Sequence, residues 1–287
     1  MIKNFKVLSN GVNMPSIGFG TYKSGSDEET AKIIKNALNL GYKMIDTASF
    51  YNNEVGIGNG IKESGIDIAK NVISGIIHPD MEMLLDFKAG VPALLLETVC
   101  IALIGTLIGT ILAIPLAFVS ASNLMPKWVS SIGLFIIAGL RTFPAFVYGL
   151  MFIRVTGPGA FAGVLTVSVI SIGMIAKLFI ESIEDLDTKI LESLDAAGCS
   201  TFEKIRYGIL PQLFTDFVST VIYRFEINIK DASILGLVGA GGIGAPLIFA
   251  MNAFNWDEVG AILCGLIVLV LVVEIVSTKI RTKLTRG

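Results

Sequence analysis

Seven charged residues lie within or beside long uncharged stretches of this sequence. They are Arg141, Lys177, Glu181, Arg224, Glu226, Lys230 and Asp231. At mid-membrane each would cost about 2.5 to 3.5 kcal/mol unless it faced water or a partner. Four-residue spacing predicts that Glu226 pairs with Lys230 and that Lys177 pairs with Glu181, and such pairs would fix helix packing. Alternatively, Arg141 or Arg224 lines a pathway for an anion, with Pro144, Glu226 and Asn228 as further candidates on it.

A glycine-rich motif follows these charges. Gly239, Gly241, Gly242 and Gly244 spell GxGxxG, but a dinucleotide site needs a preceding strand, a following helix and an acidic residue about 20 positions later. Here the flanks are uncharged. We therefore expect close backbone packing or a partly unwound element, because glycine permits both. The motif is a candidate gate.

The composition places these residues in a membrane. Hydrophobic residues make up 53% of the chain and charged residues only 16%, against about 25% in soluble domains, and the mean hydropathy is +0.74. A large soluble helical core is the alternative. Uncharged runs long enough to cross a bilayer cover residues 98–126, 155–176 and 232–256. We predict spans near residues 93–119, 129–153, 159–182, 211–234 and 259–278.

The remaining composition is less informative. The net charge is −2, and the three cysteines, Cys100, Cys199 and Cys264, include no close pair. We expect neither a disulfide framework nor a metal site, and neither a cofactor nor a nucleic-acid partner. The first 90 residues lack the basic-then-apolar pattern of a cleavable signal peptide.

A polar segment, residues 184–207, separates the third and fourth predicted spans. Leu186, Ile190 and Leu194 recur at helical spacing, which predicts an amphipathic helix that ends at Gly198. Ser200 and Glu203 form a capping-box pattern that predicts a second short helix, and Pro211 suits the first turn of the next span. This pattern indicates a compact two-helix knob. The alternative is a solvated loop without a role.

This segment resembles the coupling loop of ABC importer permeases. The matching positions are Glu192, Ala196, Ala197, Gly198, Leu210 and Pro211. Ser193 and Leu194 stand where alanines are usual, and Gly208 stands where an isoleucine is usual. These departures concern the detailed contacts.

Longer segments resemble the permease subunit of phosphonate-type ABC transporters. They are RTFPAFVYGLMF, GPGAFAGVL, GMIAKLFIESIEDLD, ILPQ and YRFEINIKDASILGLVGAGGIG. The resemblance implies a type I importer permease fold that forms a homodimeric channel and carries phosphonate or a related phosphorus oxyanion. It also implies two separate ATPase subunits and an extracytoplasmic binding protein. The chain has no Gly-Lys-Ser/Thr phosphate-binding loop, so we expect a transport subunit rather than an enzyme.

The first 66 residues have a different character. Asn10-Gly11 indicates a tight hairpin, and strands are predicted at Ile17–Thr21 and Tyr42–Thr47. Between them, Ser26 begins a capping box for a helix that ends at Gly41. A second helix is expected to begin over Glu54–Ser64.

This part resembles the opening of aldo-keto reductases, which are (β/α)₈ barrels that use NADPH. The matching segments are GVNMPSIGFGTYK and GYKMIDTASFYNNEVGIGNGIKESGI. The resemblance assigns Asp46 and Tyr51 to a catalytic tetrad whose Lys and His have no counterpart here. Two strands cannot build an eight-stranded barrel, so we expect residues 1–66 to be a non-functional remnant, a gene fusion or an artefact of sequence assembly. A membrane-anchored NADPH-dependent reductase is the alternative function.

We therefore expect an all-α permease domain over residues 67–287 in the cell membrane. Lys279, Arg281, Lys283 and Arg286 follow the last span and predict a cytoplasmic carboxyl terminus. Five spans then place the amino terminus outside. Six spans would place it inside, if residues 211–229 and 232–250 both crossed the membrane.

Overall fold

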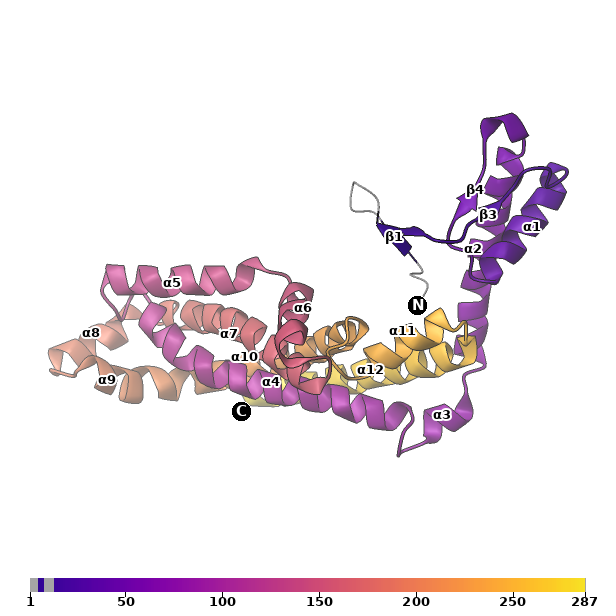
Figure 1. Cartoon of the computed structure of the whole chain (residues 1–287). Helices are drawn as coiled ribbons and strands as arrows, with labels where there is room; N and C mark the ends of the chain where they lie inside the picture. Colours follow the sequence, from indigo (N-terminus) through magenta and orange to yellow (C-terminus); the bar gives the residue numbers. More distant parts are fainter. Residues whose placement is uncertain (1–4, 8–12, 287) are drawn as a thin grey trace. The chain divides into compact units, whose positions relative to one another are not determined.

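The computed structural model describes residues 5–7 and 13–286. It divides into two compact units, Met1–Ser74 and Gly75–Gly287. Figure 1 colours the chain from its amino terminus to its carboxyl terminus. Each unit has its own buried residues.

The first unit is a small α/β fragment. β1 (Phe5–Val7) pairs antiparallel with β2 (Asn13–Pro15), and β3 (Phe19–Gly20) pairs parallel with β4 (Ile45–Asp46). The predicted hairpin residues Asn10 and Gly11 lie outside the described residues. Helix α1 (Asp27–Asn39) joins β3 to β4, and α2 (Glu54–Ile77) follows the 3₁₀ turn η1 (Ser49–Tyr51).

The predicted capping box at Ser26 is confirmed. The Glu29 N–H donates to Ser26 Oγ at 3.4 Å, and the Ser26 N–H donates to the Glu29 carboxylate at 2.9 Å. The apolar face of α1 buries Ala31, Ile34 and Ala37. Gly41, at φ +91°, turns the chain after the helix.

Among the described residues of the first unit, the parallel sheet has two strands, β3 and β4. Large apolar side chains stay exposed around it, including Leu40 at 81% and Phe50 at 85%. A complete barrel would cover surface of this kind with its remaining strands and helices. The fragment therefore has an incomplete core.

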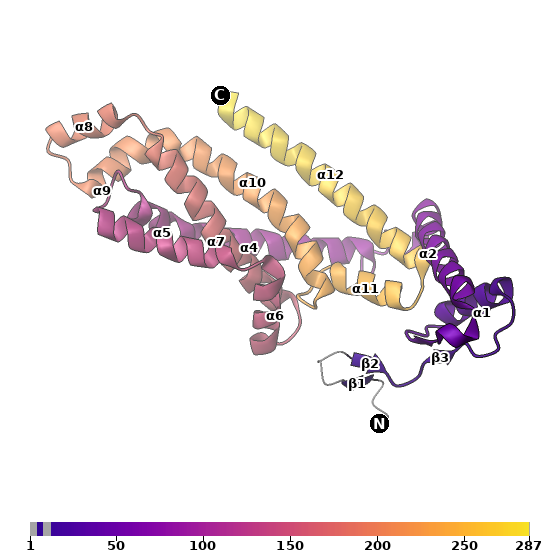
Figure 2. The same cartoon turned by 90° about the horizontal axis from the view of Figure 1, so that it is seen from above.

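The second unit is helical (Figure 2). Its α-helices are α3 (Met81–Leu85), α4 (Val91–Ser120), α5 (Lys127–Thr142), α6 (Ala145–Thr156), α7 (Ala160–Glu184), α8 (Thr188–Ala196), α9 (Thr201–Glu203), α10 (Leu210–Leu237), α11 (Gly244–Asn252) and α12 (Trp256–Arg286). A π-helical segment, Lys204–Ile209, joins α9 to α10. Both views place α8 and α9 at one end of this unit and α11 at the other.

Three helices among the described residues, α4, α7 and α12, are long and apolar enough to cross a membrane. The span predicted over residues 129–153 is not one straight helix, because α5 and α6 meet at an 84° bend. Phe143 is extended at the break, as expected for a residue that precedes a proline. Counted as one bent span, the pair makes a fourth candidate.

The fourth predicted span, residues 211–234, corresponds to α10, which has 28 residues. It falls outside the apolar set because it carries five charges, Asp216, Arg224, Glu226, Lys230 and Asp231. Residues 232–250 do not form a sixth span. They contain the end of α10, a glycine turn and most of the nine-residue α11.

The core of the second unit lies between α4, α7 and α10. A side chain on Gly105 or Gly109 of α4 would collide with α7, which allows these two helices to approach closely. Phe179 of α7 stacks on Phe217 of α10, with 4.1 Å between ring centroids. This packing holds the end of α7 and the start of α10 together, and the polar loop connects them.

Candidate functional site

The polar loop between α7 and α10 folds as the sequence predicts at its first half. Asp187 caps α8, accepting a hydrogen bond from the Lys189 N–H at 3.0 Å. Gly198, at φ +77°, ends the helix in the left-handed region. The Ser200–Glu203 capping box is present, and hydrogen bonds from the Ser200 N–H and hydroxyl lower the pKa of Glu203.

The second half of the loop differs from the prediction. The short helix α9 does not end before the next span. Instead it continues through the π-helical segment into α10, with Pro211 in the first turn of α10 as expected. Ile209 is fully buried, whereas Phe202 is 69% exposed. The loop therefore has one separate helix, α8, which packs beside the helical segment that lengthens α10 at its amino-terminal end.

Two departures from the usual coupling-loop pattern meet each other in space. A Cβ on Gly208 would lie 2.5 Å from Cδ1 of Leu194. Leu194 thus fills the space that a side chain at position 208 would take. The larger residue at position 194 and the smaller one at position 208 compensate in volume, which keeps α8 packed against the π-helical segment.

The outer surface of the loop is open. Its exposed residues include Glu192, Ala196, Ala197, Gly198, Leu210 and Pro211. Tyr207 is also 65% exposed, and the Arg206 guanidinium lies 5.6 Å from its ring centroid. Sequence reasoning missed this aromatic contribution, because helical spacing alone does not say which aromatic side chains point outward.

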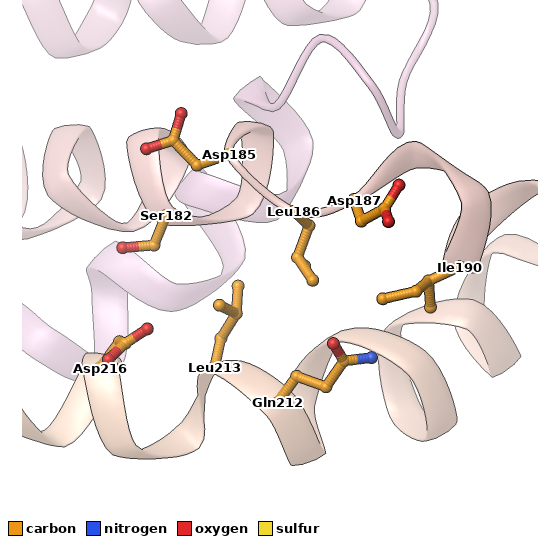
Figure 3. Close-up of a pocket in the computed structure, with 8 residues that line it drawn as sticks. All are labelled: Ser182, Asp185, Leu186, Asp187, Ile190, Gln212, Leu213 and Asp216. Carbon is orange, nitrogen blue, oxygen red and sulfur yellow. The ribbon is translucent and has the colours of Figure 1, made fainter. Parts of the chain in front are cut away.

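A cleft of about 320 Å³ lies at the base of the loop (Figure 3). Its lining residues are Ser182, Asp185, Leu186, Asp187, Ile190, Gln212, Leu213 and Asp216. Three carboxylates make this cleft unsuitable for an anion. The described residues also contain no group of three or more metal-binding side chains placed to hold an ion. This cleft is therefore not a candidate for the anion pathway.

Four of the five charges of α10 form ion pairs, and two of these four, Arg224 and Glu226, are buried. Arg224, whose side chain is 4% exposed, bonds to the Asp231 carboxylate at 3.3 Å. Lys230 lies 3.7 Å from Glu226, and Lys177 lies 3.2 Å from Glu181, so both predicted four-residue pairs are confirmed.

Glu226 has further partners that spacing could not reveal. Its carboxylate accepts a hydrogen bond from the Ser277 hydroxyl and lies 3.3 Å from the Arg281 guanidinium, both on α12. Packing of α10 against α12 brings these groups together.

Asn228 is fully buried where three helices meet. Its amide donates to the hydroxyls of Thr106 in α4 and Ser171 in α7, at 2.7 Å each. Both contacts lie far away in sequence, so nothing in the local pattern indicated them. Asn228 therefore ties the helices together instead of facing an open pathway.

Other candidate residues remain accessible. Arg141 and Pro144 are exposed at the α5–α6 bend. The side chains of Lys177 and Glu181 are 36% and 51% exposed. A charge on a membrane helix is costly against lipid. This surface therefore suits water or another protein chain.

The glycine motif forms a turn between α10 and α11, with positive φ at Gly239, Gly241 and Gly242. A Cβ on Gly241 would lie 2.6 Å from the Ala160 nitrogen, and one on Gly242 would lie 2.7 Å from Thr98 Oγ1. Close backbone packing, one of the two expectations, is the arrangement found. A helix precedes the motif, whereas a dinucleotide fold has a strand there.

In the first unit, Asp46 ends β4 and Tyr51 ends the following 3₁₀ turn. The Tyr51 ring lies 5.1 Å from that of Tyr22. These residues occupy the strand-to-helix region where a barrel enzyme builds its site, but the part of the chain that the structure describes has two parallel strands to hold them.

Both units match known families. The family described as "Binding-protein-dependent transport system inner membrane component" matches residues 105–286, more than half of the chain. The aldo/keto reductase family matches residues 16–75. The first unit is thus a truncated reductase fragment, as the sequence predicts.

Among individual proteins, the chain is 34% identical over 188 residues to a phosphite transport system permease protein of Stutzerimonas stutzeri, covering 65% of this chain and 68% of that one. It is 30% identical over 217 residues to a phosphate-import permease protein of Mycolicibacterium smegmatis. That match covers 75% of this chain and 41% of the relative.

A solved structure with a similar fold is that of the inward-facing MetNI methionine ABC transporter. The match has a TM-score of 0.60 and 18% identity, and it covers 66% of this chain and 93% of that one. The second unit therefore has the permease fold of type I ABC importers.

Proposed function

Because the chain belongs to the family of binding-protein-dependent transport system inner membrane components, we propose that it forms the translocation pathway of an ATP-driven importer for phosphonate or a related phosphorus oxyanion. The family match over residues 105–286 carries this proposal. The substrate class rests on the resemblance to phosphite and phosphate-import permeases. Permeases of this family are multi-pass membrane subunits rather than enzymes. We place this one in the cell membrane.

The polar loop of α8 and α9 is the proposed contact with a separate ATPase. It is exposed, and it connects directly to α10, which crosses the unit. A displacement of the loop by the ATPase would therefore be transmitted to the middle of the membrane through this one continuous helix. An extracytoplasmic binding protein is the proposed source of the substrate, at the opposite end.

A second copy of the chain is the proposed partner for the exposed charged surface. Arg141 and the Lys177–Glu181 pair lie on helices that otherwise face lipid or core. A water-filled pathway between two copies would remove the cost of exposing them to lipid. Arg141 and Lys177 would attract an anion there, and the pairing of Lys177 with Glu181 would keep the interaction weak enough for release.

The proposed role of Arg224 is different. Its pairing with Asp231 and its burial favour helix packing over direct substrate contact. The sequence-based alternatives for Arg141 and Arg224 thus separate: the first is a proposed pathway residue and the second is a structural one.

Uptake of labelled phosphonate, phosphite and phosphate tests the proposal. The chain would be expressed with its cognate ATPase and binding protein, in cells that lack their own importers for these anions. We expect binding-protein-dependent uptake of at least one. Accumulation of none of the three, with the complete complex present in the membrane, would contradict the proposed substrate class.

A further inference from the structure

The glycine turn between α10 and α11 is held by two adjacent side chains of a different helix. Glu97 Oε1 of α4 accepts a hydrogen bond from the Gly242 N–H at 3.1 Å. Its neighbour Thr98 accepts one from the Ile243 N–H at 3.0 Å through Oγ1. Two consecutive residues of α4 therefore satisfy two consecutive backbone donors of the turn.

These bonds lie at the amino-terminal end of α11. The residue before this helix makes no side-chain cap, and the first turn of α11 contains no acidic residue. Helix amino termini carry unsatisfied N–H groups and a partial positive charge. Glu97 brings a carboxylate to this end and Thr98 brings a hydroxyl oxygen, and their bonds to the Gly242 and Ile243 N–H groups fix the turn directly before α11.

The opposite side of the turn is held in another way. The Gly159 N–H donates to the Gly239 carbonyl at 2.9 Å. A Cβ on Gly163 of α7 would collide with the Ala240 carbonyl. These are contacts with the backbone of α7, which cannot be released without moving a helix. The hydrogen bonds to α4, in contrast, can be broken by rotation of the Glu97 and Thr98 side chains.

Burial differs between the two α4 residues. Thr98 is fully buried and donates its own hydroxyl hydrogen to the Leu94 carbonyl at 2.9 Å, which leaves its oxygen free to accept. Glu97 is half-buried. A turn with three positive-φ glycines has little backbone resistance to rearrangement, so the side-chain acceptors of α4 help it to keep one shape beside the backbone contacts with α7.

We propose that Glu97 and Thr98 form a latch that holds the glycine turn closed and that opens during the transport cycle. The inference rests on the proposed function and deepens it, because it names positioning residues for the candidate gate. Neither residue needs to touch the substrate. Their effect is on the shape of residues 238–243, between the end of α10 and the start of α11.

Hydrogen exchange of the turn amides tests the latch without requiring transport. The full-chain permease, in complex with its ATPase in lipid nanodiscs, is compared with four variants. Thr98→Val keeps the side-chain shape and removes the acceptor, and Glu97→Ala removes the carboxylate. Thr98→Ser keeps the hydroxyl. Thr110→Val removes a hydroxyl that bonds only within α4, and it serves as the matched control.

We expect exchange at Gly242 and Ile243 to be about tenfold faster in Thr98→Val and Glu97→Ala, because each loses a hydrogen bond to the turn. It should be unchanged in Thr98→Ser and Thr110→Val. Unchanged exchange in both of the first two variants would overturn the latch. If Thr98→Val fails to fold, Glu97→Ala and the acceptor-retaining Glu97→Gln give the same comparison at a half-buried position.

A second readout connects the latch to transport. In proteoliposomes, Thr98→Val should import less substrate per ATP hydrolysed, and Thr98→Ser should restore the wild-type ratio. Faster exchange with an unchanged ratio would overturn the role of the turn as a gate. Failure of the wild-type complex to import any anion would overturn the proposed function, while the exchange result would still decide whether the latch exists.

Discussion

The carboxylate of Glu226 in α10 accepts a hydrogen bond of 2.6 Å from the hydroxyl of Ser277 in α12. Both residues are buried, Ser277 to 4% exposure. The contact fastens the last helix to the helix that leaves the polar loop. It also makes Ser277 a poor position for chemical labelling, because a cysteine there would be protected by packing whichever side of the membrane it lay on.

Membrane topology can be tested at two exposed positions, Ser49 and Thr278. Cysteines there, in a background without Cys100, Cys199 and Cys264, would be treated with a membrane-impermeant reagent in intact cells. Five crossings and a cytoplasmic carboxyl terminus place residue 49 outside. We expect modification at 49 and none at 278. Protection at 49, with modification after the cells are opened, would contradict five crossings.

Gly198 and Gly157 form a matched pair for testing the loop. Both have positive φ, at +77° and +84°, and a Cβ on either would meet open space. Alanine therefore brings no clash at either position, and at Gly157, where ψ is 167°, it brings the larger backbone strain, about 1 to 3 kcal/mol, so the control is the more strained variant. We expect Gly198→Ala to weaken co-purification with the ATPase and Gly157→Ala to leave it unchanged. Equal effects of the two substitutions would contradict a docking role for the loop.

The contact between Leu194 and Gly208 predicts a compensating double mutant. Gly208→Ile alone should lower stability by about 1 to 3 kcal/mol, because the new side chain overlaps Leu194. Adding Leu194→Ala frees that space and should recover most of the loss. Thermal unfolding of the four proteins in detergent measures the coupling. Additive effects of the two changes would show that the residues do not share one space.

Local signals in the sequence predicted much of this architecture. The capping boxes at Ser26 and Ser200 and the stop at Gly198 are confirmed, because each depends on hydrogen bonds or dihedral angles within a few residues. The family resemblance supplied the fold class of the second unit. The 84° bend after Thr142 was missed because both flanking helices are apolar, although Pro144 marked the position.

Partners distant in sequence could not be predicted. Asn228 meets Thr106 and Ser171, and Glu226 meets Ser277, only after α4, α7, α10 and α12 have packed. The same holds for Glu97, which no sequence motif marks and which bonds to a turn 145 residues away. Hydrophobic patterning predicts that a helix is buried, but it does not predict which neighbour its polar residues will meet.

The Arg224–Asp231 pair should behave as a structural ion pair. Removing one partner leaves a buried charge without compensation and is expected to cost about 3 to 5 kcal/mol, whereas removing both costs less. We expect lower expression and thermal stability for Arg224→Ala and for Asp231→Ala than for the double mutant. Arg141→Ala, at an exposed position, should instead keep stability and reduce uptake. Normal stability of Arg224→Ala with abolished uptake would contradict the structural role and would indicate that Arg224 lines the pathway.

The most direct measurement of the central claim is ATP-driven uptake of a labelled phosphorus oxyanion by proteoliposomes. These would contain this chain and its cognate ATPase, with the binding protein added outside. We expect uptake that requires ATP, the ATPase and the binding protein together, and that is lost in Glu192→Lys, which reverses a charge on the exposed loop, while the variant stays in the membrane. Uptake that proceeds without the ATPase, or that is unaffected by Glu192→Lys, would contradict coupling through this loop.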